Sequence, residues 1–261
     1  MDPLRIISLG WGVQSWTLAA MVALKDLPPV DYAIHADTGH EASGTYAHAK
    51  KWTPWLEERG VKVVTVQGRR TEVVREDWSG SVMIPAFTKD NVTASEGQMG
   101  RQCTGTWKIQ PIRRFIRTII PNPKPGAVES WQGISLDEYS RMRTSDVAYI
   151  VNVYPLVDLR ITREGCVAWL QAHDLDVPPK SACTMCPYKS INSWKDLKRT
   201  GGPDWEEAVA VDEAIRSKRP KHTLFVHPGR KPLAQAVSIP EDFGAAQLEL
   251  DIPCDGGVCF V

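Results

Sequence analysis

The first 66 residues alternate between short apolar runs and amphipathic segments. Leu4–Ser8 predicts a buried strand, and a glycine-containing turn separates it from an apolar helix expected over about 15–24. A second strand is expected over 32–36, an amphipathic helix over 45–59 and a third strand over 61–66. Because parallel strands need crossover connections of this kind, the alternation predicts an α/β fold, a Rossmann-like parallel sheet with flanking helices.

The remainder of the chain is mainly helical in pattern. Helices are expected over 109–120, 162–173, 190–199 and 203–217, with strands over 128–134 and 147–154. Residues 79–100 are polar and rich in Gly and Ser, which predicts a mobile loop near the site. We therefore expect an α/β domain over 1–160 and a helical C-terminal segment over 161–261.

Composition excludes several classes of protein. The 31 basic and 31 acidic residues cancel, so there is no global basic field of the kind that non-specific nucleic-acid binders use. No apolar stretch reaches the ~20 residues of a membrane span, and the N-terminus lacks the organisation of a secretion signal. We expect a cytoplasmic protein, in which six cysteines favour metal binding or reactive thiols over disulfides.

The turn after the first strand has the features of an anion-binding loop. Gly10 and Gly12 let the backbone approach a phosphate, and the hydroxyls of Ser8 and Ser15 can donate to it together with N–H groups at the helix start. The Walker pattern is absent, and Ser15 stands where a dinucleotide-binding loop has its third glycine. Alone, such a turn is a weak signal.

A second polar motif follows the second strand. Asp37, Thr38 and Gly39 lie where open α/β sheets place ligands, at the carboxyl end of a strand. Asp37 is suited to hold a ribose hydroxyl or Mg²⁺, and equally to begin a helix. It is also a candidate for a catalytic role.

These motifs together resemble a known family. Ser-x-Gly-x-Gly-x-x-Ser over 8–15, followed by Asp-Thr-Gly-x-Glu over 37–41 and Thr-Tyr, is similar to the phosphoadenosine phosphosulfate (PAPS) reductase-like family. This family is part of the adenine nucleotide α-hydrolase superfamily with the PP-loop ATP pyrophosphatases, and the resemblance is greatest to its phage and bacterial type. It extends through residues 133–143 to 183–194 and implies a HUP-type fold. It also implies that Ser8, Gly10, Gly12 and Ser15 bind the phosphate or sulfate of the nucleotide. The ATP pyrophosphatases usually have an Asp just before the serine, where this chain has Gln14.

Three cysteines predict a metal centre. Cys183 and Cys186 are spaced as two ligands of one centre, and Cys103 can supply a third. From spacing alone, a structural zinc site completed by His222 or His227 and an iron–sulfur cluster are equally good explanations.

The resemblance favours the cluster. Iron–sulfur sulfonucleotide reductases carry Cys-Cys-x-x-x-Lys-x-x-Pro, and aligning Lys108 places Cys103 on the first of the two cysteines, with Thr104 on the second. The resemblance thus implies a 4Fe–4S cluster with three protein thiolates. The fourth ligand is exogenous or comes from Cys166, Cys254 or Cys259, although an apolar helix around Cys166 predicts a buried, inert thiol.

The C-terminal tail offers a nucleophile. In sulfonucleotide reductases a cysteine near the C-terminus attacks the substrate's sulfur, which implies such a role for Cys259. The family's tail reads Glu-Cys-Gly, whereas Phe260 follows Cys259 here. Nucleophile, fourth cluster ligand and idle thiol stay open for this residue.

Several cations are candidates for the anionic end of the nucleotide. Guanidinium groups match phosphate and sulfate oxygens, which favours Arg101, Arg141 and Arg143 together with Lys108. Surface helix faces explain Arg141 and Arg143 equally well. Asp137 and Glu138 are suited to bind Mg²⁺ or to cap a helix.

We expect an enzyme that uses ATP or PAPS for sulfur transfer or sulfonucleotide reduction. Its partners would be the adenine nucleotide, a thioredoxin-like reductant or sulfur donor, a nucleic-acid or nucleotide acceptor, and a second copy in a homodimer, with no membrane. The alternative is a non-catalytic, zinc-stabilised nucleotide-binding accessory protein.

Overall fold

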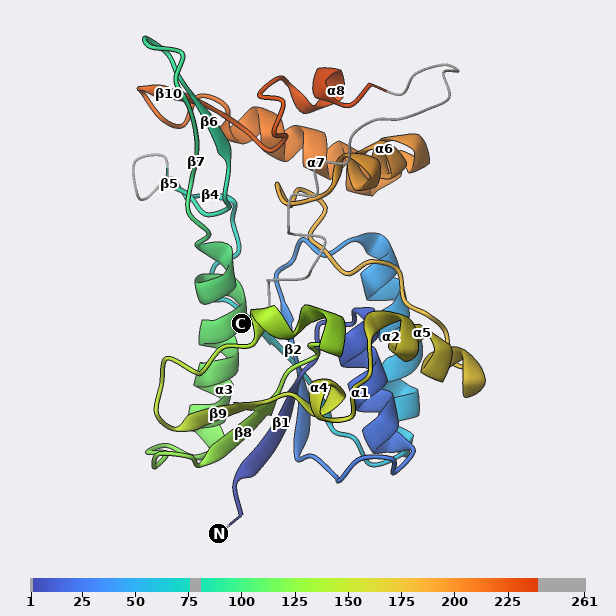
Figure 1. Ribbon diagram of the computed structural model, residues 1–261. Helices are drawn as coiled ribbons and strands as arrows, with labels where there is room; N and C mark the ends of the chain where they lie inside the picture. The colour runs from blue at the N-terminus through green and yellow to red at the C-terminus, as the bar shows by residue number, and fades with distance from the viewer. Residues whose placement is uncertain (1, 76–80, 239–261) are drawn as a thin grey trace. The chain divides into compact units, whose positions relative to one another are not determined.

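Five strands pair side by side in one parallel sheet, in the order β3-β2-β1-β8-β9 (Figure 1). The computed structural model describes residues 2–75 and 81–238. The strands are β1 (Leu4–Ser8), β2 (Tyr32–Asp37), β3 (Val63–Gln67), β8 (Val128–Trp131) and β9 (Ile150–Val153). Every neighbouring pair is parallel. The sheet confirms the α/β class predicted from the sequence.

The central strand shows why this sheet is covered on both faces. Successive side chains of a strand point to opposite faces, and on β1 the neighbours Ile6 and Ile7 are both fully buried. Ile7 belongs to a core shared with Leu18, while Ile6 belongs to a second core shared with Ile116. The apolar run at the N-terminus is therefore that of a strand buried on both sides.

Helices supply the two cores. One core contains side chains of α1 (Val13–Ala23), α2 (Ser43–Glu58), α4 (Pro155–Asp158) and α5 (Arg163–Ala172). The other contains α3 (Gln110–Ile119), which continues a π-helical turn, η2 (Thr104–Ile109). The sequence pattern predicted only the α-helical part of this second segment. Among the described residues, no helix is both long and apolar enough to cross a membrane.

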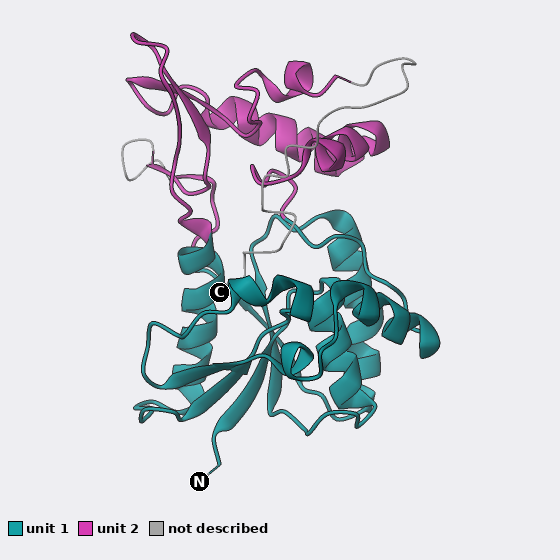
Figure 2. Ribbon diagram, viewed as in Figure 1, with its two compact units in different colours: residues 1–69, 104–182, 258–261 teal, residues 70–103, 183–257 magenta. Residues whose placement is uncertain are grey.

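Residue contacts divide the described chain into two units (Figure 2). Unit 1 consists of residues 2–69 and 104–182 and contains the parallel sheet, and unit 2 consists of residues 70–103 and 183–238 apart from the gap at 76–80. This division runs differently from the linear boundary expected at residue 160, because each unit is built from two separate segments. The Cys-x-x-Cys segment and the segment ending at Cys103 fall in the same unit.

Unit 2 combines helices with short strands. Its strands are β4 (Val74–Arg75), β5 (Ser81–Val82), β6 (Phe87–Asp90), β7 (Glu96–Gln98) and β10 (His222–Phe225), and its helices are α6 (Ile191–Thr200), α7 (Gly202–Ile215) and α8 (Leu233–Ala236). The antiparallel order β10-β6-β7 joins the two segments of the unit. The expectation of a loop over 79–100 was therefore wrong for β5, β6 and β7. The C-terminal segment contains a strand besides its helices.

Candidate functional site

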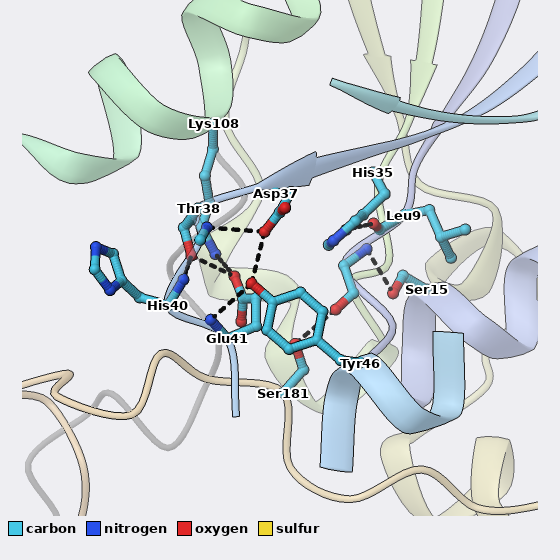
Figure 3. A network of polar contacts seen from close by, with 12 residues as sticks. Leu9, Ser15, His35, Asp37, Thr38, His40, Glu41, Tyr46, Lys108 and Ser181 are labelled. Carbon is cyan, nitrogen blue, oxygen red and sulfur yellow. Dashed lines mark hydrogen bonds and ion pairs between the residues drawn. The ribbon is translucent and has the colours of Figure 1, made fainter. Parts of the chain in front are cut away.

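The turn after β1 is held by its own side chains. Ser15 accepts a hydrogen bond from the Gly10 N–H (3.2 Å) and its hydroxyl donates to the Gly12 carbonyl (3.3 Å). The Gly10 carbonyl in turn accepts from the Ser181 hydroxyl at 2.6 Å (Figure 3). Trp11, between the two glycines, has a positive φ of 57°. Ser8 ends β1, so the structure places the predicted loop at the carboxyl edge of the sheet.

Gln14 joins this turn to a distant part of the chain. Its Nε2 donates to Glu138 Oε2 (3.1 Å), and its Oε1 accepts from the Arg163 guanidinium (3.2 Å). Glu138 also pairs with Arg141, both in the 3₁₀ segment η3 (Leu136–Arg141), and burial raises the pKa of Glu138. The adjacent Asp137 accepts from the Arg163 N–H (2.8 Å). The predicted site residues Asp137, Glu138 and Arg141 thus form contacts that the sequence did not indicate.

The motif after β2 forms a dense polar network (Figure 3). Asp37 Oδ1 accepts from the Gly39 N–H (2.8 Å) and from the Tyr46 hydroxyl (2.7 Å). Burial, followed by the hydrogen bond to Asp37, raises the pKa of Tyr46. Thr38 is fully buried and donates to Glu41 Oε1 at 3.2 Å. One oxygen of Asp37 is therefore already used to hold its own loop.

Lys108 reaches this network from the π-helical turn. Its Nζ lies 3.4 Å from Glu41 Oε1, and only 8% of its side chain is exposed. A π turn inserts one extra residue into a helix and is frequent at functional sites. The irregular turn places the predicted cation beside the carboxyl ends of β1 and β2.

A cavity of about 390 Å³ lies within unit 1. Its wall includes the last residue of β1, Ser8, and two side chains at the carboxyl end of β8, Ser130 and Gln132. In the order β3-β2-β1-β8-β9, the chain adds β2 and β3 on one side of β1 and then β8 and β9 on its other side. Open α/β sheets bind ligands at such a switch point, which here lies between β1 and β8. The volume falls within the range of about 300–1,000 Å³ that is typical of small-molecule sites.

The remaining walls suit a ligand that is part anion and part apolar. Cationic side chains come from Lys108, Arg113 and Arg143, and Arg113 is paired with Asp146. Apolar side chains come from three isoleucines. The complete lining consists of Ser8, Lys108, Ile109, Ile112, Arg113, Ser130, Gln132, Arg143, Thr144, Ser145, Asp146, Ile150 and Asn152.

Arg143 is fixed by its surroundings. Its backbone N–H donates to the Tyr154 hydroxyl (2.8 Å), and its Nη1 donates to the carbonyls of Ser140 and Met142 (both 2.8 Å). The two Nη1 bonds hold the guanidinium through one of its nitrogens, and the backbone bond holds the main chain. The sequence indicated Arg143 as a ligand for an anion, and the structure places it in the cavity wall.

The three predicted metal ligands belong to unit 2. Cys103, Cys183 and Cys186 are half-buried, and the Cys186 N–H donates to the Cys183 carbonyl (3.1 Å), which closes a turn. Within residues 2–75 and 81–238, however, no three His, Cys, Asp or Glu side chains are placed to hold a metal ion together. The metal centre is therefore not tested by the described residues and stays a prediction.

The other candidate ligands differ in their surroundings. Cys166 is fully buried, and burial raises the pKa of its thiol to about 11, which confirms the expected buried position. His227 Nδ1 accepts from the Gly229 N–H (3.0 Å), and burial lowers the pKa of the ring to about 4. His222 Nε2 lies 3.7 Å from Asp90 Oδ2. Cys254 and Cys259 lie outside the described residues.

Arg101 also belongs to unit 2. Its guanidinium lies over the Tyr188 ring, 4.3 Å from the centroid. This contact uses one face of the guanidinium in a cation–π interaction.

No protein-family model and no curated protein matches the chain at a significant level. Among solved structures, it is similar to phosphoadenylyl-sulfate (PAPS) reductase from Candida auris in a phosphate complex, at 13% identity and a TM-score of 0.43. The match covers 67% of this chain and 75% of that chain.

Proposed function

We propose that the chain is an enzyme that binds an adenine nucleotide in the cavity between the carboxyl ends of β1 and β8. The observation that carries the proposal is the lining of this cavity, which places Lys108, Arg113 and Arg143 beside apolar side chains at the switch point of the sheet. A nucleotide combines an anion with an apolar ring, so it matches both kinds of wall.

The resemblance in the first turn and in the motif after β2 supports sulfur chemistry on that nucleotide. In a reductase, a thiolate attacks the sulfur of PAPS, the bond from sulfur to the nucleotide's phosphate oxygen breaks, and adenosine 3′,5′-bisphosphate leaves. A dithiol reductant then releases sulfite and becomes a disulfide. In a sulfurtransferase, an acceptor oxygen takes AMP from ATP with release of pyrophosphate, and a sulfide then displaces the AMP.

The cofactor that we propose is a 4Fe–4S cluster on Cys103, Cys183 and Cys186, with zinc as the alternative. The support is the sequence pattern and the placement of all three cysteines in unit 2. Because the described side chains do not form a three-ligand group, neither reaction above is routed through a metal.

Binding is the first test of the proposal. Calorimetric titration with ATP and PAPS, each with and without Mg²⁺, should give saturable binding to the wild-type chain. Arg143→Gln should weaken it about tenfold, because a charge-assisted hydrogen bond to phosphate is lost. Arg114→Gln is the matched control, since Arg114 lies on the same helix as Arg113 but outside the cavity lining. Equal affinities in the two variants would contradict this site.

Product analysis tests the chemistry. Sulfite release from PAPS with thioredoxin supports the reductase, and acceptor-dependent pyrophosphate release from ATP supports the sulfurtransferase. Nucleotide binding without either product favours the accessory protein named above, because a non-catalytic protein binds without turnover.

A further inference from the structure

Tyr154 binds both main-chain groups of Arg143 through one hydroxyl. The Arg143 N–H donates to the Tyr154 oxygen at 2.8 Å, and the Tyr154 hydroxyl donates to the Arg143 carbonyl at 2.6 Å. A hydroxyl can do both, because it has one donor and two acceptor lone pairs. Tyr154 itself is buried, with 7% of its surface exposed. The two bonds together fix the peptide groups on both sides of the Arg143 Cα.

Arg143 lies in a segment without regular secondary structure. Residues 142–145 belong to neither a helix nor a strand and connect η3 towards β9. Since no helix or sheet ladder orients the backbone there, bonds from side chains take over this task. A third such bond comes from Asn152, whose Nδ2 donates to the Arg143 carbonyl at 2.9 Å. The Arg143 carbonyl is thus bound by two side chains.

Tyr154 and Asn152 belong to a well-ordered part of unit 1. Asn152 lies in β9 and Tyr154 directly follows this strand, so residues two apart here share one face of the sheet. The Tyr154 carbonyl accepts from the N–H groups of Val157 (3.0 Å) and Asp158 (3.1 Å), at the start of α4. The strand and the helix therefore hold Tyr154, and Tyr154 holds Arg143.

The side chain of Arg143 is the part that can meet a ligand. The residue is exposed and belongs to the cavity wall. A guanidinium has five N–H donors, and the two bonds to the carbonyls of Ser140 and Met142 are made by Nη1, without Nε or Nη2. A fixed main chain restricts where this group can lie, so less conformational freedom is lost when it binds an anion.

From these contacts we propose that Tyr154 is a positioning residue, whose hydroxyl holds the Arg143 main chain so that the guanidinium meets the anionic group of the nucleotide. The inference rests on the proposed nucleotide site and adds a residue that supports it from behind. Tyr154 is outside the cavity lining, so its effect on affinity passes through Arg143.

The test is a double-mutant cycle on nucleotide affinity. ATP and PAPS are titrated calorimetrically into the wild type, Tyr154→Phe, Arg143→Gln and the double variant. Tyr154→Phe should weaken binding about fivefold, the equivalent of one hydrogen bond. In the Arg143→Gln background the same change should alter affinity by about twofold or less, because the guanidinium that Tyr154 positions is already gone.

Tyr149→Phe is the matched control. Tyr149 directly precedes β9, is also buried, and lies outside the cavity lining. Its hydroxyl makes no hydrogen bond within residues 2–75 and 81–238. The change therefore removes a buried tyrosine hydroxyl from the same region without touching Arg143, and it should leave the affinity unchanged.

Each outcome of the cycle decides the inference. An equal loss in both backgrounds would mean that the hydroxyl acts on the site independently of Arg143, and no loss at all would mean that Arg143 needs no such support. Either result overturns the role of Tyr154 and leaves the nucleotide site standing. Absence of binding of both nucleotides to the wild type overturns the proposed function, and the role of Tyr154 with it.

A measurement on the wild-type chain keeps the inference testable if Tyr154→Phe does not fold. The Arg143 N–H should exchange with solvent deuterium at least about tenfold more slowly than in an unstructured peptide, because it is bonded to the Tyr154 oxygen. Exchange at the unprotected rate would show that this bond is not kept in solution and would overturn the proposal.

Discussion

Lys108 and Glu41 form an ion pair in which both side chains are almost completely buried, with 3.4 Å between Nζ and Oε1 and exposed fractions of 8% and 2%. Glu41 comes from the segment after β2, and Lys108 comes from the π-helical turn before α3. The pair therefore joins two segments far apart in the sequence and holds the Lys108 side chain beside the cavity it lines.

Removal of either partner should destabilise the chain strongly. Lys108→Met or Glu41→Gln alone should lower the free energy of unfolding by about 3 kcal/mol, because each leaves a buried polar group without its partner. In the double variant the loss should be smaller than the sum of the two single losses. Urea unfolding at pH 7 measures all four proteins of this cycle. Strictly additive losses would show that the pair contributes no coupling.

Gly133 should tolerate no side chain. A Cβ there would lie 2.7 Å from the Ser15 nitrogen and 2.8 Å from its Cα, closer than real contacts allow. Gly133→Ala should lower the free energy of unfolding by about 2 kcal/mol, because the first turn of α1 must move. Nucleotide affinity should fall with it, since Ser15 holds the loop. Gly105→Ala is the control, as no atom lies within 4 Å of the Cβ added there, and thermal unfolding compares the two.

His48 should make unit 1 less stable in acid. Its ring lies edge-on to Trp16, with centroids 5.3 Å apart, and burial lowers its pKa from 6.5 to about 4. Below pH 6.5 His48 of the unfolded chain is protonated, whereas in the folded chain it stays neutral until the pH falls to about 4. Its contribution to stability is thus complete above pH 6.5 and is lost as the pH falls towards 4.

The variant His48→Phe measures this contribution. Lowering the pH from 7 to 5 should reduce the free energy of unfolding of both proteins. The reduction should be smaller in the variant than in the wild type, with a difference on the order of 2 kcal/mol. Some loss should remain, because burial also lowers the pKa of His35 and His227. Urea unfolding at the two pH values gives the comparison, and identical losses in both proteins would exclude His48 as a source.

The proposed cluster makes a prediction about metal content. Chain purified without oxygen should carry about four irons and four sulfides, with broad absorption near ~400 nm. Cys183→Ser should lose most of the iron because a ligand is removed, whereas Cys166→Ala should keep it, since that thiol is buried in the core of unit 1. One zinc and no visible absorption would instead support the structural zinc site. Iron retained in Cys183→Ser would show that this cysteine is not a ligand.

The parts of the fold that sequence predicts best are those with strong periodicity. Leu4–Ser8 and the helix after it are recognisable because a mainly apolar run precedes a glycine turn. The parallel pairing of the strands follows from the alternation of strand and helix patterns along the chain. The strand β7 (Glu96–Gln98) has no such signal, since it is three residues long and largely polar. It forms because the preceding strand β6 is available as its antiparallel partner, and the short polar sequence of β7 does not signal that pairing.

In the candidate site, too, the residues that belong to recognisable motifs were predictable and the others were not. Ser8, Lys108 and Arg143 were expected at an anion site from their residue types and motifs, and all three line the cavity. Gln132 was missed, because it lay inside the strand expected over 128–134, where a single polar residue carries no functional signal. Only the pairing of β8 with β1, between residues more than a hundred positions apart, brings it beside Ser8.

The position of β1 at the centre of the sheet has a consequence during synthesis of the chain. β1 pairs with β2 on one side, but on its other side it pairs with β8, through residues as late as Trp131. Until that strand leaves the ribosome, the nascent chain holds a half-sheet whose edge is the apolar strand β1. Such an open edge is a template for pairing with another chain. The interval between the synthesis of β1 and that of β8 is therefore the stage at which we expect the unfinished chain to be most prone to aggregation.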